Sequence, residues 1–353
     1  MPLKKLPKKS KIIIVVGPTA SGKSDYAIVL AKRIDGEIIS ADSLQVYRGM
    51  DLGTGKIKRD RNEATRVSSS SIGLAVGSAK NNKMEALSEK TFLERDFYSR
   101  GIHHHLLDVA SPTRQYSVAR WVKDAKKAIA DILSRGKVPI IAGGTAFYID
   151  ALMGRSSVAP VAPNAKLRAR LSKFSAQELF KILKSRDPRR AKMIDPQNKV
   201  RIIRALEIIE ISGKKVPHEQ KTAPQYDAKW IGLNPKPEIL KERIIKRLDA
   251  RLKKGMVDEV QKLHNNGVSW KRLESFGLEY RWIAKYFQSI KVQPSKISRL
   301  NLEQEMLDGI IRDSIRYSKR QMTWWKKNKE IRWITKTIKV SETLLLKAQH
   351  VEE

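Results

Sequence analysis

The sequence predicts an α/β fold in which helices flank a parallel β-sheet and a helical segment interrupts the core. Three observations lead to this prediction. Short segments rich in β-branched residues alternate with helical patterns over residues 12–152, a similar apolar segment returns near residue 230, and the residues between are basic and helical in pattern. Strand–helix–strand alternation is typical of parallel sheets, whose neighbouring strands are joined by helices.

The predicted core begins with a buried strand. Residues 12–16 (IIIVV) are a β-branched run that Gly17-Pro18 ends, as expected for a strand buried on both faces. Apolar residues then recur at helical spacing between Ser24 and Arg33. The further predicted elements are strands over 37–40, 137–142 and 230–233 and a helix over 118–134.

The pattern changes at residues 160–163 (PVAP), a stiff connection that basic helical segments follow. One of these helices, residues 199–212, is predicted to end at Gly213, a residue type favoured just after a helix. Residues 61–100 contain SSSS and NNK with weak periodicity and are predicted to form an extended loop. We therefore predict a core of residues 11–157 and 228–335, a helical insertion of residues 158–227, and a C-terminal tail of residues 336–353.

The chain is strongly basic. Its 353 residues include 71 Lys and Arg against 37 Asp and Glu, which gives a formal net charge of +34. A polyanionic partner accounts for this excess, because Lys and Arg that neutralise phosphates release counterions on binding. A composition that simply favours lysine is the alternative. The 41% of hydrophobic residues indicates a globular protein rather than a disordered one.

The chain contains no cysteine, which excludes disulfides, thiolate catalysis and zinc sites built on cysteine. No apolar run reaches the roughly 20 residues needed to span a bilayer. The basic start, residues 1–11, runs directly into the first strand and leaves no room for a signal peptide. We expect a cytoplasmic protein that does not associate with membranes and acts as a monomer.

A phosphate-binding motif follows the first strand. Residues 17–24 (GPTASGKS) match the pattern G-x-x-x-x-G-K-[ST] and lie between a predicted strand and a predicted helix, as this motif requires. Backbone N–H groups of such a loop point at phosphate oxygens, the lysine adds positive charge, and the final hydroxyl can bind Mg²⁺. The sheet is therefore predicted to be P-loop NTPase-like. The phosphate-binding residues are Gly17, Pro18, Thr19, Ala20, Ser21, Gly22, Lys23 and Ser24, with Ser24 as the Mg²⁺ ligand.

Asp42 comes directly after the second predicted strand. Because the carboxyl ends of parallel strands face the ligand-binding crevice, this carboxylate is expected beside the phosphate-binding loop. There it can accept a proton or hold a metal. The alternative is an aspartate that caps the start of a helix.

Further segments resemble one enzyme family. After GPTASGKS come SADSLQVYRGMDLGTGK (40–56), HHLLDV (104–109), AGGTAFYIDAL (142–152), RIIRALEI (201–208) and RIIKRLDARLKKGMVDEV (243–260), in this order. This ordered set is similar to the tRNA dimethylallyltransferases of the bacterial type. The resemblance implies transfer of a dimethylallyl group from dimethylallyl diphosphate to N6 of the tRNA adenine that follows the anticodon on its 3′ side. It also implies Mg²⁺ as the cofactor, and the diphosphate rather than ATP on the phosphate-binding loop.

The resemblance also implies roles for single residues. Asp42 corresponds to the general base, and Lys23 to the group that neutralises the departing diphosphate. Thr145 corresponds to a catalytic residue near the diphosphate and tRNA, and Arg247 to a further diphosphate contact. The implied tRNA-binding residues are Asp42, Ser43, Leu44, Gln45, Thr145, Arg168, Arg201 and Arg204. The segment 275–280 (SFGLEY) departs from the family pattern around its glycine.

Several structural alternatives stay open. An ion pair between Arg204 and Glu207, three residues apart on one helix, would give that arginine a structural role. Arg247 has a comparable alternative in pairing with nearby acidic residues of its helix. The run His103-His104-His105 suggests a metal, although three consecutive residues do not easily converge on one ion, and Trp324-Trp325 fits either RNA stacking or packing on the core.

Two other functions are compatible with the motifs. A small-molecule P-loop kinase would share the phosphate-binding loop and Asp42, but the net charge of +34 is hard to explain for such an enzyme. A non-catalytic RNA-binding protein would explain the charge, but intact Lys23, Ser24 and Asp42 argue against it.

Overall fold

The computed structural model describes residues 10–60, 96–156, 161–217, 223–292 and 295–334. The chain divides into two compact units. One comprises Met1–Leu152 with Gln225–Glu353, and the other is Met153–Pro224. The predicted tail of residues 336–353 lies outside the described residues. Within the described ranges, no helix has the length and apolar character that crossing a membrane requires.

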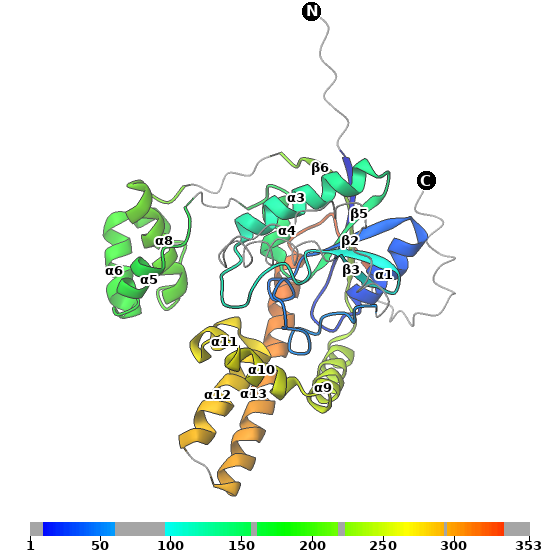
Figure 1. Cartoon of the computed structure of the whole chain (residues 1–353). Helices are drawn as coiled ribbons and strands as arrows, with labels where there is room; N and C mark the ends of the chain where they lie inside the picture. The colour runs from blue at the N-terminus through cyan, green and yellow to red at the C-terminus, as the bar shows by residue number, and fades with distance from the viewer. Residues whose placement is uncertain (1–9, 61–95, 157–160, 218–222, 293–294, 335–353) are drawn as a thin grey trace, which may run out of the picture. The chain divides into compact units, whose positions relative to one another are not determined.

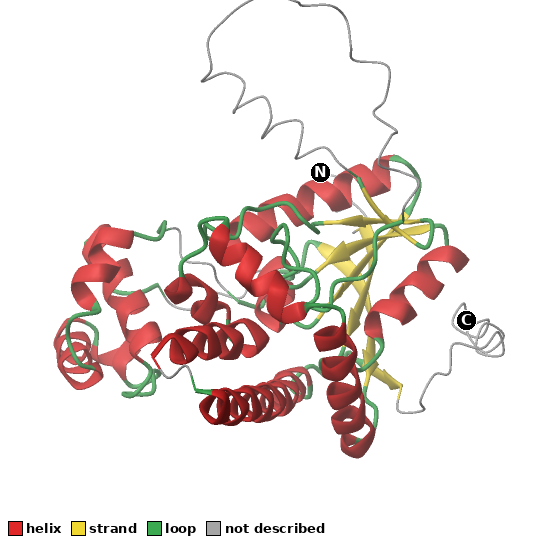
Figure 2. Ribbon diagram, turned by 60° about the horizontal axis from the view of Figure 1, so that its bottom comes forward, coloured by secondary structure: helices red, strands yellow, loops and turns green. Residues whose placement is uncertain are grey.

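The first unit is built on a seven-stranded sheet with the order β3-β4-β2-β5-β1-β6-β7 (Figures 1 and 2). All neighbouring strands run parallel except β3 and β4, which pair antiparallel. The strands are β1 (Ser10–Val16), β2 (Gly36–Ser40), β3 (Phe97–Ser99), β4 (Ile102–His105), β5 (Val138–Gly143), β6 (Tyr226–Leu233) and β7 (Arg332–Ile334). The predicted α/β class with a parallel sheet is confirmed.

Helices cover both faces of this sheet because its central strands are apolar on both sides. Val15, Ile38 and Ile140 pack with α1 (Lys23–Arg33) in one buried cluster. The side chains next to them along the strands, Ile14, Ile39 and Ile141, point to the opposite face of the sheet and are also buried. On that face, α3 (Val118–Ser134) packs on β2 and β5. The continuous apolar runs in the sequence therefore reflect a sheet buried between two helical layers.

Among the described residues of this unit, the remaining helices follow β5 and β6. They are α4 (Ala146–Leu152), α9 (Pro237–Lys253), α10 (Met256–Asn265), α11 (Trp270–Phe276), α12 (Leu278–Val292) and α13 (Lys296–Trp325). Helices α12 and α13 lie side by side, and α13 also contacts α4 and α9 (Figure 1). With 30 residues, α13 is about 45 Å long at the usual rise per residue. It therefore reaches from the tip of the α12–α13 pair back to the sheet.

The predicted loop of residues 61–100 needs a correction at its end. Residues 61–95 lie outside the described residues, but Phe97–Ser99 form strand β3. This strand pairs antiparallel with β4 across a tight turn at Arg100 and Gly101, both with positive φ. Two antiparallel strands can be joined by a tight turn, so β3 needs no helix or long connection before β4. A strand of only three residues gives too short a pattern to be recognised next to a long polar segment.

The second unit is a helical bundle with its own core. Its helices are α5 (Ala165–Leu171), α6 (Ala176–Arg186), α7 (Pro188–Ala191) and α8 (Lys199–Ser212). Leucine and isoleucine side chains from α5, α6 and α8 form the buried cluster. Helix α8 has the bounds that the sequence predicts: Asn198 accepts the N–H of Arg201 at its start, and Gly213 adopts the left-handed conformation at its end.

Candidate active site

The phosphate-binding motif forms the turn between β1 and α1. Gly17 has a φ of 155°, and a Cβ at this position would lie 2.6 Å from the carbonyl oxygen of Leu233. The hydroxyl of Ser21 is buried and has no hydrogen-bond partner among the described residues. Such an orphaned donor inside a loop of this type fits an anion, which would accept its hydrogen bond.

Lys23 begins α1, and its ammonium group donates to the carbonyl oxygen of Pro18 at 3.2 Å. Burial lowers the pKa of Lys23 to about 8. The negative charge of Asp42 opposes this shift, and the positive charge of Arg247 adds to it. The three side chains that the sequence analysis assigned to catalysis or donor binding are therefore close enough to affect one another electrostatically.

Asp42 lies in the loop after β2, at the carboxyl edge of the sheet. Its Oδ1 accepts the backbone N–H groups of Leu44 (2.9 Å) and Gln45 (3.3 Å), while Oδ2 makes no hydrogen bond with a described residue. The hydroxyl oxygen of Thr145, just after β5, accepts the N–H of Ser43 at 3.1 Å. One oxygen of Asp42 thus orders a turn of residues 43–46 rather than capping a helix, and the other stays available.

A single pocket of about 360 Å³ joins these elements. The phosphate-binding loop contributes Thr19 and Ala20, and the loop after β2 contributes Asp42, Ser43 and Leu44. Residues 276–279, where α11 ends and α12 begins, also line it, so the segment that departs from the family pattern belongs to this site. The pocket therefore places a phosphate-binding loop and a carboxylate on the walls of the same cavity.

Arginines outnumber acidic residues in the lining of this pocket. Arg251 pairs with Glu279 at 2.8 Å, and Arg281 with Asp313 at 3.7 Å. Arg247 lines the pocket, and its guanidinium makes no hydrogen bond or ion pair with any described residue. Its pKa is lowered, mainly because the surrounding protein withdraws the guanidinium from bulk water and also because Arg251 lies near. The structure thus does not bear out the pairing of Arg247 with acidic residues of its own helix.

Helix α13 contributes a wall that sequence reasoning missed. Gln321 accepts the backbone N–H of Thr19 at 2.8 Å and donates to the carbonyl oxygen of Gly144 at 2.9 Å, so it joins the phosphate-binding loop to the end of β5. Tyr317 lines the pocket, and burial and then Asp42 raise its pKa, which keeps the phenol neutral. Arg316 and Arg320 lie on the same wall. Arg316 and Arg320 are four residues apart, and Tyr317 is three residues before Arg320; this spacing on one helix face is the signal that could have pointed to them.

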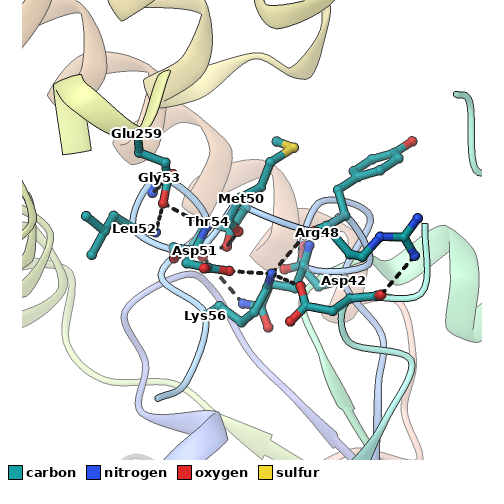
Figure 3. Close-up of polar contacts among 12 residues, drawn as sticks. Asp42, Arg48, Met50, Asp51, Leu52, Gly53, Thr54, Lys56 and Glu259 are labelled. Carbon is teal, nitrogen blue, oxygen red and sulfur yellow. Dashed lines mark hydrogen bonds and ion pairs between the residues drawn. The ribbon is translucent and has the colours of Figure 1, made fainter. Parts of the chain in front are cut away.

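The loop after Tyr47 is held by ion pairs (Figure 3). Lys56, whose side chain is 2% exposed, pairs with Asp51 at 2.7 Å and with Asp108 at 2.5 Å. Asp108 follows β4 and resembles a metal-binding aspartate of P-loop enzymes. Its carboxylate instead neutralises a buried lysine, so its contacts are those of a structural residue.

The histidine run lies on β4, where successive side chains alternate between faces. His103 and His105 share a face with Glu37, and their nitrogens lie 3.2 Å and 2.8 Å from its Oε2. Burial would raise the pKa of Glu37, but hydrogen bonds from Arg135 and His105 outweigh it and lower that pKa to about 2. Two of the three histidines do converge, but on a carboxylate that Arg135 already neutralises.

The three arginines predicted to contact tRNA lie in the helical unit. Arg168 and Arg204 both bind Glu207, a fully buried carboxylate, at 2.7 Å and 2.5 Å. The alternative ion pair of Arg204 is therefore present, and each arginine keeps about a third of its side chain exposed. Arg201 lies on the surface of α8, and its side chain makes no hydrogen bond or ion pair within the described part of the chain.

The tryptophan pair at the end of α13 packs on the core. Trp325 is buried beside Trp230, with ring centroids 6.3 Å apart. The indole N–H of Trp324 donates to Asp150 at 2.6 Å. Both contacts favour the structural alternative for these residues.

Known proteins resemble this chain over most of its length. A family model described as IPP transferase matches residues 73–328, and one described as isopentenyl transferase matches residues 10–87. A tRNA dimethylallyltransferase 2 of Treponema denticola is 35% identical over 339 residues, which cover 94% of this chain and 98% of that protein. A tRNA dimethylallyltransferase of Pelotomaculum thermopropionicum is 34% identical, with 93% and 91% covered.

Solved structures show the same likeness. The tRNA isopentenylpyrophosphate transferase of Bacillus halodurans superposes with a TM-score of 0.59 at 29% identity, and 97% of this chain and 95% of that chain are covered. A eukaryotic dimethylallyltransferase acting on tRNA shares the fold, with a TM-score of 0.69 at 23% identity over 97% of this chain and 78% of that chain.

Proposed function

This chain belongs to the IPP transferase family of tRNA dimethylallyltransferases, and we propose that it prenylates N6 of the tRNA adenine that follows the anticodon on its 3′ side. The donor is dimethylallyl diphosphate, and diphosphate is released. One observation carries the proposal: a single cationic pocket is lined by the phosphate-binding loop, by Asp42 and by Arg247.

The diphosphate of the donor binds to the loop of residues 17–24. Its oxygens accept hydrogen bonds from the loop's N–H groups and from the orphaned hydroxyl of Ser21. Lys23 and Arg247, two cations whose pKa values are lowered in the free protein, gain an anionic partner. Because the allylic C–O bond breaks with both electrons going to the diphosphate, these charges stabilise the leaving group as its negative charge grows.

Mg²⁺ fits the donor set of this loop. Ser24 is exposed at the start of α1, and its hydroxyl has no partner among the described residues, so it is free to serve as an oxygen ligand. When bound, the ion adds Lewis-acid stabilisation of the departing diphosphate. The carboxylate of Asp108 is paired with Lys56. We therefore assign Ser24 alone as the Mg²⁺ ligand from this chain.

Asp42 is the general base of the proposed reaction. As N6 of the adenine bonds to the allylic carbon, Oδ2 takes the proton that the amine loses. The N–H groups of Leu44 and Gln45 hold Oδ1 and so orient the carboxylate. Thr145 holds the same loop through Ser43, and we assign it a role beside the reacting groups. The adenine must leave the base stack to reach this carboxylate.

The helical unit of residues 153–224 is the proposed tRNA-binding insertion. Arg201 is free to contact a backbone phosphate, while Arg168 and Arg204 hold a fixed geometry on Glu207 and present their exposed edges. Ser43, Leu44 and Gln45 contact the nucleotide at the pocket. A monomeric state and a cytoplasmic location are part of this proposal.

The test is transfer of labelled dimethylallyl diphosphate to an unmodified tRNA in the presence of Mg²⁺, with ATP hydrolysis measured in parallel. We expect label on the tRNA without ATP turnover. A tRNA with guanine in place of the target adenine is the matched control and should stay unlabelled. ATP turnover without labelled RNA would identify a kinase instead. Tight tRNA binding with neither activity would identify a non-catalytic RNA-binding protein.

A further inference from the structure

One carboxylate holds the backbone of the loop of residues 51–55, which lines the pocket. Oε2 of Glu259, in α10, accepts the N–H groups of Asp51 (2.9 Å) and Leu52 (2.6 Å), and Oε1 accepts that of Gly53 (3.0 Å) (Figure 3). Three successive donors thus share one side chain more than 200 residues away in the sequence. Hydrogen bonds to a charged acceptor are stronger than neutral ones, so this contact fixes the loop firmly.

Arg251 holds the carbonyl oxygens of the same loop. Its Nη1 donates to Leu52 (3.2 Å) and Gly53 (3.1 Å), and its Nη2 pairs with Glu279. The N–H groups of the loop therefore donate to a carboxylate, and its carbonyl oxygens accept from a guanidinium. Both come from helices that follow β6, so these helices hold the loop in addition to the ion pair between Lys56 and Asp51.

Two glycines bring this loop against functional side chains. A Cβ on Gly53 would lie 2.5 Å from the ring of Tyr280, whose hydroxyl donates to Oε1 of Glu259 at 2.7 Å. A Cβ on Gly55 would lie 2.6 Å from Nη2 of Arg247. Gly55 also has a φ of 61°, which a side chain would strain. The guanidinium of Arg247 therefore packs directly on the backbone of the loop.

This packing matters because the guanidinium of Arg247 makes no hydrogen bond or ion pair with a described residue. The loop backbone is the surface that limits where its guanidinium can lie. We infer that Glu259 is a positioning residue for the donor site: it fixes the loop of residues 51–55, and the loop in turn directs Arg247 toward the diphosphate. The inference rests on the proposed function, in which Arg247 binds that group.

The first test is the affinity for inorganic diphosphate with Mg²⁺, measured by calorimetry on the full chain without tRNA. Glu259→Gln keeps the shape of the side chain, but its amide nitrogen then faces N–H donors. We expect the diphosphate Kd to rise about five- to tenfold, the change that the loss of one hydrogen bond of ordinary strength produces. Asp258→Asn is the matched control: it removes a neighbouring carboxylate of the same helix turn that has no described hydrogen bond, and the Kd should stay unchanged.

The second test separates positioning from general stability. In an Arg247→Ala background, Glu259→Gln should have no further effect on the diphosphate Kd, because the residue through which it acts is gone. Gly55→Ala, which leaves Glu259 intact and displaces Arg247, should weaken diphosphate binding by a similar factor. Far-UV circular dichroism and thermal unfolding confirm that each variant is folded.

The inference is overturned if Glu259→Gln binds diphosphate normally, or if its effect is as large without Arg247 as with it. Transfer kinetics add an independent readout: the KM for the donor should rise while the KM for tRNA is kept. A failure of the proposed function would give a different result. In that case the unmutated protein itself would bind diphosphate but would transfer no label to tRNA.

Discussion

The lowered pKa of Lys23 makes donor binding depend on pH in a window that can be calculated. In the free protein this pKa is about 8 instead of 10.5, because the ammonium group is buried. A bound diphosphate places negative charge beside it and raises the pKa again. Binding above pH 8 must therefore take up a proton. The apparent affinity falls as the pH rises above 8, because the unliganded lysine has lost its charge.

The magnitude follows from the titration of one group. Between pH 7 and pH 9 the protonated fraction of a group with a pKa of about 8 falls from roughly 90% to roughly 10%, so the Kd should rise about tenfold, or about 1.4 kcal/mol. The donor itself does not titrate in this window, since the second pKa of a phosphoryl group is about 6.

Calorimetry with dimethylallyl diphosphate in the absence of tRNA measures both the Kd and the proton uptake. Uptake appears as a binding enthalpy that depends on the ionisation enthalpy of the buffer. Lys23→Arg is the control, because an arginine stays charged to pH 12 and its Kd should change little between pH 7 and 9. A parent Kd that is flat over this range, or a binding enthalpy that is the same in all buffers, would refute the reasoning.

Three further perturbations test other parts of the molecule. Asp42→Ala should lower the transfer rate at least about 100-fold, which is the usual minimum for the loss of a general base. The affinity for tRNA should stay within a few-fold of the parent. Equal losses of rate and affinity would instead make Asp42 an anchoring residue. Arg201→Ala should weaken tRNA binding and reduce the slope of log K against log salt by roughly 0.7–0.9, the value for one phosphate contact; an unchanged slope would assign this arginine a purely structural role. Glu37→Gln should destabilise the protein at pH 7 by roughly 3 kcal/mol, because the folded pKa of about 2 lies below the unfolded value of 4.5. This contribution is complete above pH 4.5 and is lost as the pH falls toward 2, so urea denaturation of parent and variant should converge at low pH.

The sequence predicts those parts of the site that are contiguous in the chain. The phosphate-binding loop is one run of eight residues with a fixed pattern, and Asp42 follows a strand whose carboxyl end must face the ligand. Helix α8 was predictable to the residue because Asn198 and Gly213 mark its ends chemically. Local rules suffice for such features.

Features that depend on distant contacts were not predictable. Gln321 acts on Thr19, and Glu259 on residues 51–53, across separations that no local pattern encodes. The pairing of Arg204 with Glu207 could be expected from their spacing of three residues, but the sequence does not show that Arg168, 39 residues away, binds the same carboxylate or that the fold buries it. Burial, which decides whether a charge is structural or available, is set by packing of the whole unit.

The contact between Thr19 and Gln321 also bears on when the protein becomes competent during its synthesis. Its two residues are 302 positions apart. At the usual rate of about 5–20 residues per second, the ribosome makes Gln321 roughly 15–60 s after the phosphate-binding loop. During that interval the loop lacks the acceptor of its Thr19 N–H, and the pocket lacks the wall that α13 supplies. A nascent chain can therefore fold its first strands early, yet it cannot hold a finished pocket until translation has passed helix α13.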